Sequence, residues 1–394
     1  MRRRLDGQWR VAVVDPEVEH LYQPGLLFLP FGGSEKGMVR ARARTLVRGI
    51  DWIRDSVVAV DTATRTIKLE AGELRYDLLV IASGSRIRPD LTEGLTGTGW
   101  RENAFDFYTL DGARALRTAM ARMRGGRLVV NVVEMPIKCP VAPLEFLFLA
   151  DEFFKRAGVR SGVELVFATP LDGAFTRPLA SRTLGHLLTT KGIRVETEFA
   201  TGSVDGQAKK LVSYDGRVLD YDLLVTIPTH SGAEFLETSG LGDELSFVPT
   251  DKLTLAAKGL SNVFVLGDAT DLPSSKAGSV AHFQAELLAE NLSCVIAGRA
   301  PEPTFDGHAN CFIETGFGKA MLIDFNYDTE PLPGRYPMPG IGPLTLLGES
   351  RLNHLGKKAF HWLYWNGLLP ARPLPLGARM SMVGKRLAPA HATT

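Results

Sequence analysis

The chain has 394 residues, with 45 lysines and arginines against 44 aspartates and glutamates and a net charge of +1. A chain of this length is expected to form roughly two or three domains with a large core. The balanced charge argues against nucleic acid or another acidic polymer as a partner. Three cysteines exclude a disulfide scaffold. No uninterrupted run of about 18 apolar residues occurs, and no apolar run follows the basic residues 1–5, so we expect neither a membrane-spanning helix nor a secretory signal.

Residues 9–15 form the first apolar run and are predicted to be a strand that ends in Asp15. An acid at the end of the second strand of a βαβ unit hydrogen-bonds the ribose of a bound dinucleotide, although Asp-Pro after a strand also fits an ordinary turn. The Gly-x-Gly-x-x-Gly motif that should precede such a strand is absent from the chain. We therefore expect a start that lacks the first strand and its glycine turn, with residues 1–5 as the end of the helix that follows them.

A second apolar strand, residues 76–85, contains the small residues Ser83 and Gly84 near its end. Small side chains at that place let a cofactor approach the backbone. The same Tyr-Asp-Leu-Leu-Val pattern returns at residues 221–228.

Between the two copies lie a strand at residues 128–133, a helical stretch at residues 145–155 and a strand at residues 162–167. This order predicts a second α/β unit that is inserted into the first.

The most specific motif is an apolar strand with Gly267 and Asp268 at its carboxyl end. A carboxylate there can accept hydrogen bonds from a polyol, and the glycine allows close approach. A helix is predicted to begin near residues 276–279, where its free N–H groups and positive dipole end suit an anion. The alternative is a plain strand, turn and helix with Asp268 as the N-cap.

Two of the cysteines occupy loops next to predicted strands. Cys139 follows the strand at residues 128–133, and Cys311 precedes an apolar strand at residues 320–325. Their spacing alone favours free buried thiols, and the flavin motifs elsewhere in the chain favour a redox pair instead. The third, Cys294, lies in a helical pattern and is predicted to belong to the core.

Together these motifs resemble the sulfide:quinone oxidoreductases, flavoproteins with two dinucleotide-binding domains that are related to glutathione reductase and type II NADH dehydrogenase. The resemblance covers nearly the whole chain, and the segments that carry it are Val14-Asp15 with residues 20–25, and residues 76–85, 136–139, 267–271, 274–284 and 306–311. It implies an α/β fold of two Rossmann-like domains of the glutathione-reductase type, FAD as the cofactor, and a C-terminal segment that associates with the membrane.

The implied domain boundaries follow from this resemblance. Residues 1–95 would be the first part of the FAD-binding domain, and residues 96–215 the inserted second domain. Residues 216–300 would be the second part of the FAD-binding domain, and residues 301–394 a region on the flavin and quinone side that reaches the membrane interface.

The resemblance also implies the site residues. Cys139 and Cys311 would carry sulfur beside the flavin, with Glu145 as a proton acceptor, although a solvated glutamate at a helix start is the simpler alternative. Lys138 and the helix start near Ser279 would favour the thiolates. The predicted FAD contacts are Asp15, Ser83, Gly84, Gly267, Asp268, Lys276, Ala277 and Gly278. His20 and His282 are weaker candidates that also fit structural roles, and no metal site is expected.

The implied reaction is the oxidation of hydrogen sulfide or a related thiol, with electrons passed to a membrane quinone. At residues 134–140, where an NADH-binding turn needs glycine, the chain has prolines and no glycine, which argues against NADH. Two alternatives stay open, namely another quinone reductase of this superfamily such as a type II NADH dehydrogenase, and a truncated, flavin-free scaffold.

Residues 352–369 combine aromatic rings with a basic pair, which suits a membrane interface. We expect peripheral attachment to the cytoplasmic face of the cell membrane, with Pro370 and Pro373 ending the helix. The alternative is a helix that packs on the protein's own core or on a second subunit of a homo-oligomer.

Overall fold

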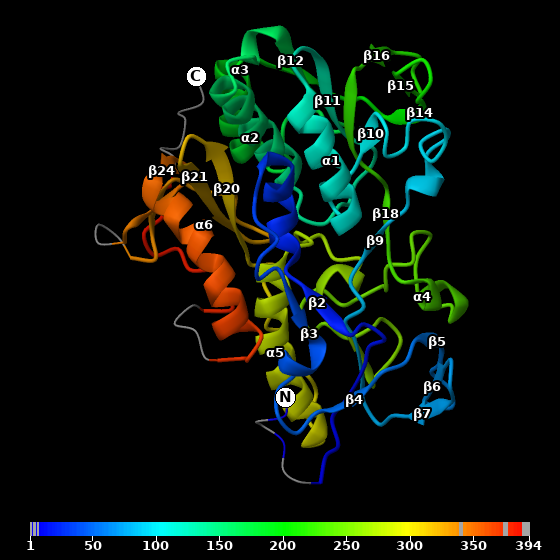
Figure 1. Cartoon of the computed structure of the whole chain (residues 1–394). Helices are drawn as coiled ribbons and strands as arrows, with labels where there is room; N and C mark the ends of the chain where they lie inside the picture. Colours follow the sequence, from blue (N-terminus) through cyan, green and yellow to red (C-terminus); the bar gives the residue numbers. More distant parts are fainter. Residues whose placement is uncertain (1, 3–4, 6–7, 339–341, 373–376, 388–394) are drawn as a thin grey trace.

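The computed structural model describes residues 2, 5, 8–338, 342–372 and 377–387. Pro373 and the predicted helix end at residues 1–5, apart from residues 2 and 5, lie outside this range. Figure 1 shows three parts: an α/β unit around β11 and β12, a second unit that contains α5, and a C-terminal sheet covered by α6. Among the described residues, no helix is long and apolar enough to cross a membrane.

The inserted unit is built on a five-stranded parallel sheet with the strand order β10-β17-β11-β12-β13. Its strands are β10 (Ala104–Phe105), β11 (Gly126–Val132), β12 (Val163–Ala168), β13 (Ile193–Glu196) and β17 (Leu223–Ile227). The helices are α1 (Leu110–Arg122), α2 (Ala142–Arg156) and α3 (Pro178–Thr190), and η5 (Arg160–Gly162) is a single turn. All five residues of β17 are buried, as expected for a parallel strand that is covered on both faces.

The position of β17 corrects the predicted boundary at residue 216. Leu223 to Ile227 pair in parallel with Leu128 to Val132 of β11. A three-stranded antiparallel sheet of β14 (Thr201–Asp205), β15 (Lys210–Ser213) and β16 (Val218–Asp220) precedes it. The sheet of the inserted unit therefore extends to Ile227, and the repeated strand pattern belongs to two different sheets.

The other α/β unit contains two short parallel pairs, β1 with β4 and β8 with β19. These strands are β1 (Ala12–Val14), β4 (Asp51–Ile53), β8 (Leu79–Ile81) and β19 (Val263–Val265). Around them lie β2 (Glu19–Leu21), β3 (Val39–Ala41), β5 (Val57–Asp61), β6 (Thr66–Leu69), β7 (Glu73–Arg75), β9 (Arg86–Ile87) and β18 (His230–Ser231). The helical elements are η2 (Gln23–Phe31), η3 (Arg42–Arg44), η4 (Pro89–Leu91), α4 (Glu234–Thr238), η6 (Gly267–Ala269) and α5 (Gly278–Ile296).

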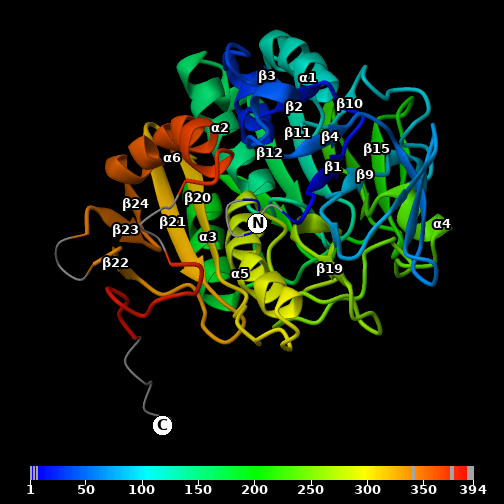
Figure 2. The same cartoon turned by 90° about the horizontal axis from the view of Figure 1, so that it is seen from below.

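The C-terminal part is a mostly antiparallel sheet with the order β20-β21-β23-β22, and β24 pairs with β21. The strands are β20 (Ala309–Gly316), β21 (Lys319–Phe325), β22 (Gly334–Tyr336), β23 (Leu344–Leu346) and β24 (Glu349–Ser350). The chain then forms α6 (Arg351–Leu363) and a π-helical turn, η7 (Tyr364–Leu368). Figure 2 shows α6 lying over this sheet and α5 beside β20.

One buried apolar cluster joins all three parts. It includes Leu116 of α1, Phe146 of α2, Phe283 of α5 and Ile313 of β20. The rings of Phe107 and Phe146 stack with centroids 5.0 Å apart. Because a close-packed core transmits small shifts rather than absorbing them, these elements hold their loops in fixed relative positions. The predicted cysteine loops lie on elements of this shared core.

Candidate active site

Cys139 lies in the turn between β11 and α2, as the sequence predicts. Its φ of 49° is in the left-handed region, which a non-glycine residue occupies at a conformational cost. The backbone N–H of Cys139 donates to the carbonyl of Lys276 at 2.6 Å. The turn is therefore fixed to the segment just before α5.

Cys311 is the third residue of β20, so it lies inside a strand rather than at the predicted loop junction. The Ser279 hydroxyl, in the first turn of α5, donates to the carbonyl of Asn310 at 2.7 Å. Both cysteine segments are thus attached to the start of the same helix. Each cysteine is free and half-buried. The pKa of Cys139 is raised by burial first, then by the charge of Glu145 and then by that of Cys311, so the two cysteines are near enough to interact.

The pKa values of both thiols are raised, whereas a positively charged environment would lower them. Burial raises the pKa of Cys311 to about 12, with a further contribution from the charge of Glu145. Burial and Glu145 also raise the pKa of Cys139, although Lys357 opposes the shift. Desolvation therefore outweighs the nearby positive charges at both thiols, and the expected stabilisation of the thiolates by Lys138 and the start of α5 stays a prediction. A thiolate formed here would need an adjacent proton acceptor.

Glu145 is that neighbour, and the alternative of a solvated helix-start glutamate is wrong. Its side chain is 1% exposed, on α2. The carboxylate forms an ion pair with Lys357 of α6 and accepts a hydrogen bond from the backbone N–H of Glu314 at 2.7 Å. Burial raises the pKa of Glu145, and Lys357 opposes that shift. Burial would lower the pKa of Lys357, but Glu145 reverses the effect and raises it.

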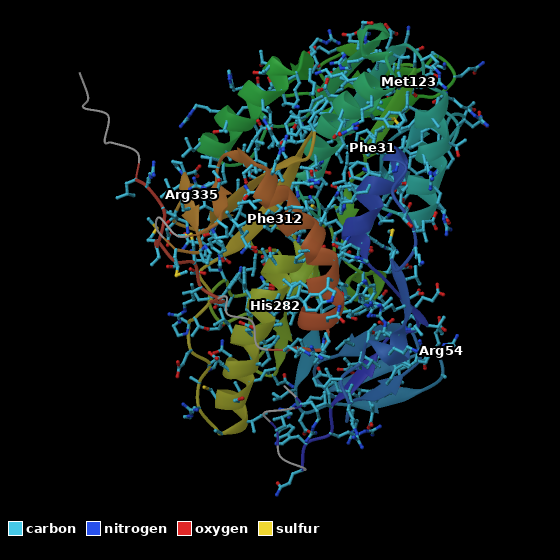
Figure 3. The ribbon with its side chains drawn as sticks, turned by 60° about the vertical axis from the view of Figure 1, so that its left-hand side comes forward. Phe31, Arg54, Met123, His282, Phe312 and Arg335 are labelled. Atoms are coloured by element: carbon cyan, nitrogen blue, oxygen red, sulfur yellow. The ribbon has the colours of Figure 1, made fainter. Side chains whose placement is uncertain are left out.

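The sequence analysis missed Lys357, the partner of this glutamate, and the residues that continue the polar contacts beyond the pair. Lys357 also donates to the carbonyl of Phe312 at 3.0 Å. His354, one turn earlier on α6, contacts the buried carboxylate of Glu314 at 2.9 Å. Figure 3 shows Phe312 beside α6, where Gly356 leaves room for its ring. A polar chain therefore runs from the cysteine region to the half-buried His354.

The residues predicted to bind FAD gather mainly at the ends of β8 and β19. The Ser85 hydroxyl donates to the Asp268 carboxylate at 3.1 Å, and the N–H of Gly267 donates to Gln284 at 2.6 Å. Gly267 has a φ of 71°, which favours glycine. Ser83 and Gly84 lie beside them, because the N–H of Leu266 donates to the carbonyl of Ile81 in the neighbouring strand.

These residues fit a dinucleotide such as FAD. The amide nitrogen of Gln284 is buried without a protein partner, so it has a free donor at this place. Ala277, the N-cap of α5, has no side-chain cap, which leaves N–H groups of the first turn from Gly278 available to an anion. Lys276 differs from the simple expectation, since its ammonium donates to the carbonyls of Asp268 and Thr270 at 2.8 and 2.6 Å. It supports the loop that carries Asp268.

Asp15 lies at the end of β1, and its carboxylate pairs with Arg42 at 2.7 Å. Arg42 also contacts His20 Nδ1 at 2.5 Å, and His20 Nε2 contacts the Tyr364 hydroxyl at 2.5 Å. Burial and the charge of Arg42 lower the pKa of His20 to about 4. His20 therefore has a structural part in joining the first unit to η7, and the ribose contact of Asp15 stays a prediction.

Three other side chains considered in the sequence analysis have defined partners or positions. His282 pairs with Glu286 on α5 at 3.3 Å. Cys294 is buried in the same helix, which confirms the core prediction. Lys138 donates to the Gln23 side chain at 3.1 Å.

The C-terminal helix has both a packed and an exposed side. Tyr22 contacts the rings of His361 and Tyr364 with centroids 4.7 and 4.9 Å apart. That part of the helix packs on the protein's own core. The side chains of Leu352, Leu355 and Trp362 are instead exposed by 50, 58 and 66%.

Comparisons with known proteins agree with this architecture. The chain is 26% identical over 379 residues to the mitochondrial sulfide:quinone oxidoreductase of Mus musculus, covering 94% of this chain and 82% of that protein. The mitochondrial sulfide:quinone oxidoreductase of Dictyostelium discoideum is 26% identical over 383 residues, with 94 and 82% covered. The X-ray structure of the sulfide:quinone oxidoreductase from Aquifex aeolicus matches with a TM-score of 0.73 at 18% identity, covering 91% of this chain and 86% of that one. No protein-family model matches the chain.

The resemblance predicted from the sequence motifs is thus confirmed, as is the α/β fold with two Rossmann-like units. The membrane contact of the C-terminal segment and the roles of the individual site residues stay predictions.

Proposed function

We propose that this chain is an FAD-dependent sulfide:quinone oxidoreductase in which Cys139 and Cys311 form the sulfur-carrying pair. The observation that carries the proposal is the attachment of both cysteine segments to the start of α5, through Lys276 and Ser279. The similarity to curated sulfide:quinone oxidoreductases over 94% of the chain supports the same reaction.

The sulfur step begins from a disulfide between Cys139 and Cys311. Hydrosulfide attacks one sulfur, so a new S–S bond forms as a persulfide and the bond between the cysteines breaks, which leaves a thiolate on the other residue. A nucleophilic acceptor, such as a second thiolate, then removes the outer sulfur and leaves the cysteine pair reduced. Bound FAD would accept the two electrons released when the disulfide forms again and would pass them to the quinone.

We propose that Glu145 accepts the protons released in this cycle and that Lys357 compensates its charge. A thiol whose pKa is raised to about 12, as for Cys311, holds its proton at neutral pH. The Glu145 carboxylate is the nearby group that can accept a proton, and its ion pair with Lys357 supplies the compensating charge. His354 and Glu314 would connect this pair toward the surface.

The quinone must arrive from the membrane, and we assign that contact to the exposed side of α6. Leu352, Leu355 and Trp362 are spaced so that they lie along one side of a helix, and all three are exposed. Apolar and aromatic residues in this arrangement suit an interfacial helix. The proposed location is therefore peripheral, on a membrane surface.

The test is anaerobic addition of sulfide to purified flavin-bound protein, with the visible flavin absorbance as the readout. The flavin should bleach with sulfide and recover when a soluble quinone is added. Cys139→Ser and Cys311→Ser should keep flavin but lose the bleaching, and Cys294→Ser is the matched control because that thiol belongs to the core. Bleaching by NADH and not by sulfide would favour a type II NADH dehydrogenase, and a colourless folded protein would favour a flavin-free scaffold.

A further inference from the structure

We infer that a pocket between residues 40–48 and the end of the C-terminal helix binds the headgroup of an anionic phospholipid. This inference extends the proposed membrane contact by naming the lipid class. The pocket has a volume of about 360 Å³, and Arg40, Arg44 and Arg48 lie on one side of it. Trp365 and Leu369, from the end of the C-terminal helix, also line it.

The three arginines are available for a ligand. All are exposed, and none forms an ion pair with a carboxylate of the described residues. Their neighbour Arg42 differs, because Asp15 neutralises it at 2.7 Å. No acidic side chain is among the described residues that line the pocket. In a chain with a net charge of only +1, this is a local concentration of positive charge.

The apolar side of the pocket favours a lipid over a free anion. The guanidinium of Arg40 lies over the ring of the buried Trp365, 4.3 Å from the centroid, so this cation is held against an aromatic floor of the pocket. Leu46, Val47 and Leu369 add apolar walls. A free phosphate would contact only the arginines, whereas a phospholipid places phosphate against them and its glycerol and upper acyl carbons against the apolar walls.

The position of the pocket agrees with this occupant. Trp362, at the last turn of α6, is exposed and lies three residues before Trp365. Figure 1 shows that the C-terminal end of α6 lies on the same side of the molecule as β2 and β3, and His361 contacts the carbonyl of Gly37 at 3.1 Å. Exposed aromatic residues next to clustered arginines are typical of surfaces that meet the headgroup layer.

The experiment measures sedimentation of the full-length flavin-bound protein with vesicles of phosphatidylcholine, with or without phosphatidylglycerol. We expect much tighter binding to the anionic vesicles and a loss of that difference at high salt. Each arginine near an anionic surface contributes roughly fivefold to binding, so Arg40→Gln, Arg44→Gln and Arg48→Gln together should weaken it on the order of 100-fold.

The matched control removes the same charge elsewhere, with Arg75→Gln, Arg122→Gln and Arg182→Gln on β7, α1 and α3, all exposed. The control should keep most of the preference for anionic vesicles. Equal losses in the two triple variants would refute the pocket and indicate a non-specific effect of net charge. Tight binding of soluble glycerol phosphate by calorimetry, with vesicle binding unchanged in the pocket variant, would also refute it.

Sulfide-dependent bleaching of the flavin is measured in the same preparations without vesicles. The pocket variant should bleach like the unmodified protein, because its substitutions lie away from the cysteine segments. If the unmodified protein fails to bleach but still prefers anionic vesicles through these arginines, the proposed reaction is wrong and the lipid site stands. If it bleaches and shows no lipid preference, the lipid site is wrong and the reaction stands.

Discussion

Replacing Lys357 with methionine should make the stability of the protein depend strongly on pH. In the native structure Glu145 is buried, and its ion pair with Lys357 compensates its charge. Removing one partner of a buried pair typically costs roughly 3–5 kcal/mol, because the other charge is left uncompensated. Glu145 can escape this cost by binding a proton, so the penalty depends on the pH.

The sign follows from proton binding in the two states. Burial already raises the pKa of Glu145, and loss of Lys357 removes a charge that lowers it, so the folded variant retains the proton to higher pH. Below the ordinary glutamate range, near about 4.3, both states are protonated and there is no penalty. Above it the folded state binds more protons than the unfolded state, so stability falls by about 1.4 kcal/mol for each pH unit until Glu145 ionises in the folded state.

The assay is urea unfolding followed by tryptophan fluorescence, at a pH of about 5 and of about 8, with the unmodified protein beside it. Lys357→Met should be close to the unmodified protein at the lower pH and lose roughly 3–4 kcal/mol at the higher pH. The double variant Glu145→Gln with Lys357→Met removes both charges and should recover most of that loss. An equal loss at both pH values, or no recovery in the double variant, would contradict a buried ion pair.

Three other outcomes are expected. Gly356→Ala places a methyl group 2.9 Å from the Phe312 ring and should displace α6, lowering the melting temperature by several degrees, whereas Gly72→Ala, with open space around it, should not. Leu116→Ala in the fully buried face of α1 should cost roughly 2–5 kcal/mol in urea unfolding; a loss below about 1 kcal/mol would argue against the described core. Leu355→Ser with Trp362→Ser should reduce vesicle binding at unchanged stability, while Leu91→Ser with Tyr214→Ser, two residues that are also exposed, should leave it intact. Similar losses of vesicle binding in both double variants would contradict a membrane contact through α6.

The sequence predicts the elements that carry the site because their signals are local. The apolar strand before Cys139, the strand before Gly267 and the helix that begins near Lys276 all occur as expected. Each depends on residues within a few positions of one another, which is the range over which periodicity and turn chemistry act.

The partners of Glu145 could not be predicted in the same way. Lys357 lies 212 residues further along the chain, and only the packing of α6 on β20 and β21 brings it to α2. Charge and helix position alone describe Glu145 as a solvated residue at a helix start. That description is wrong, because the burial of Glu145 and its ion pair depend on tertiary contacts that the local sequence does not specify.

The sheet that each copy of the Tyr-Asp-Leu-Leu-Val pattern joins could not be predicted, for a related reason. Both form strands, yet β8 pairs with β19 and β17 pairs with β11. An apolar run specifies that a strand is buried but not which sheet receives it. The C-terminal helix shows the same ambiguity, because one side packs on Tyr22 while Leu355 faces outward.

The shared attachment of Cys139 and Cys311 to the start of α5 limits which changes in chain length the protein can tolerate. One link uses the backbone carbonyl of Lys276 and the other the hydroxyl of Ser279, three positions later. Inserting a single residue between them would lengthen the separation of the two links, by about 3.3 Å for an extended residue before Gly278 or about 1.5 Å for a residue added inside the helix. Many side-chain replacements in this segment leave both links intact, whereas any insertion or deletion separates them. Related sequences should therefore vary in composition here while keeping its length constant.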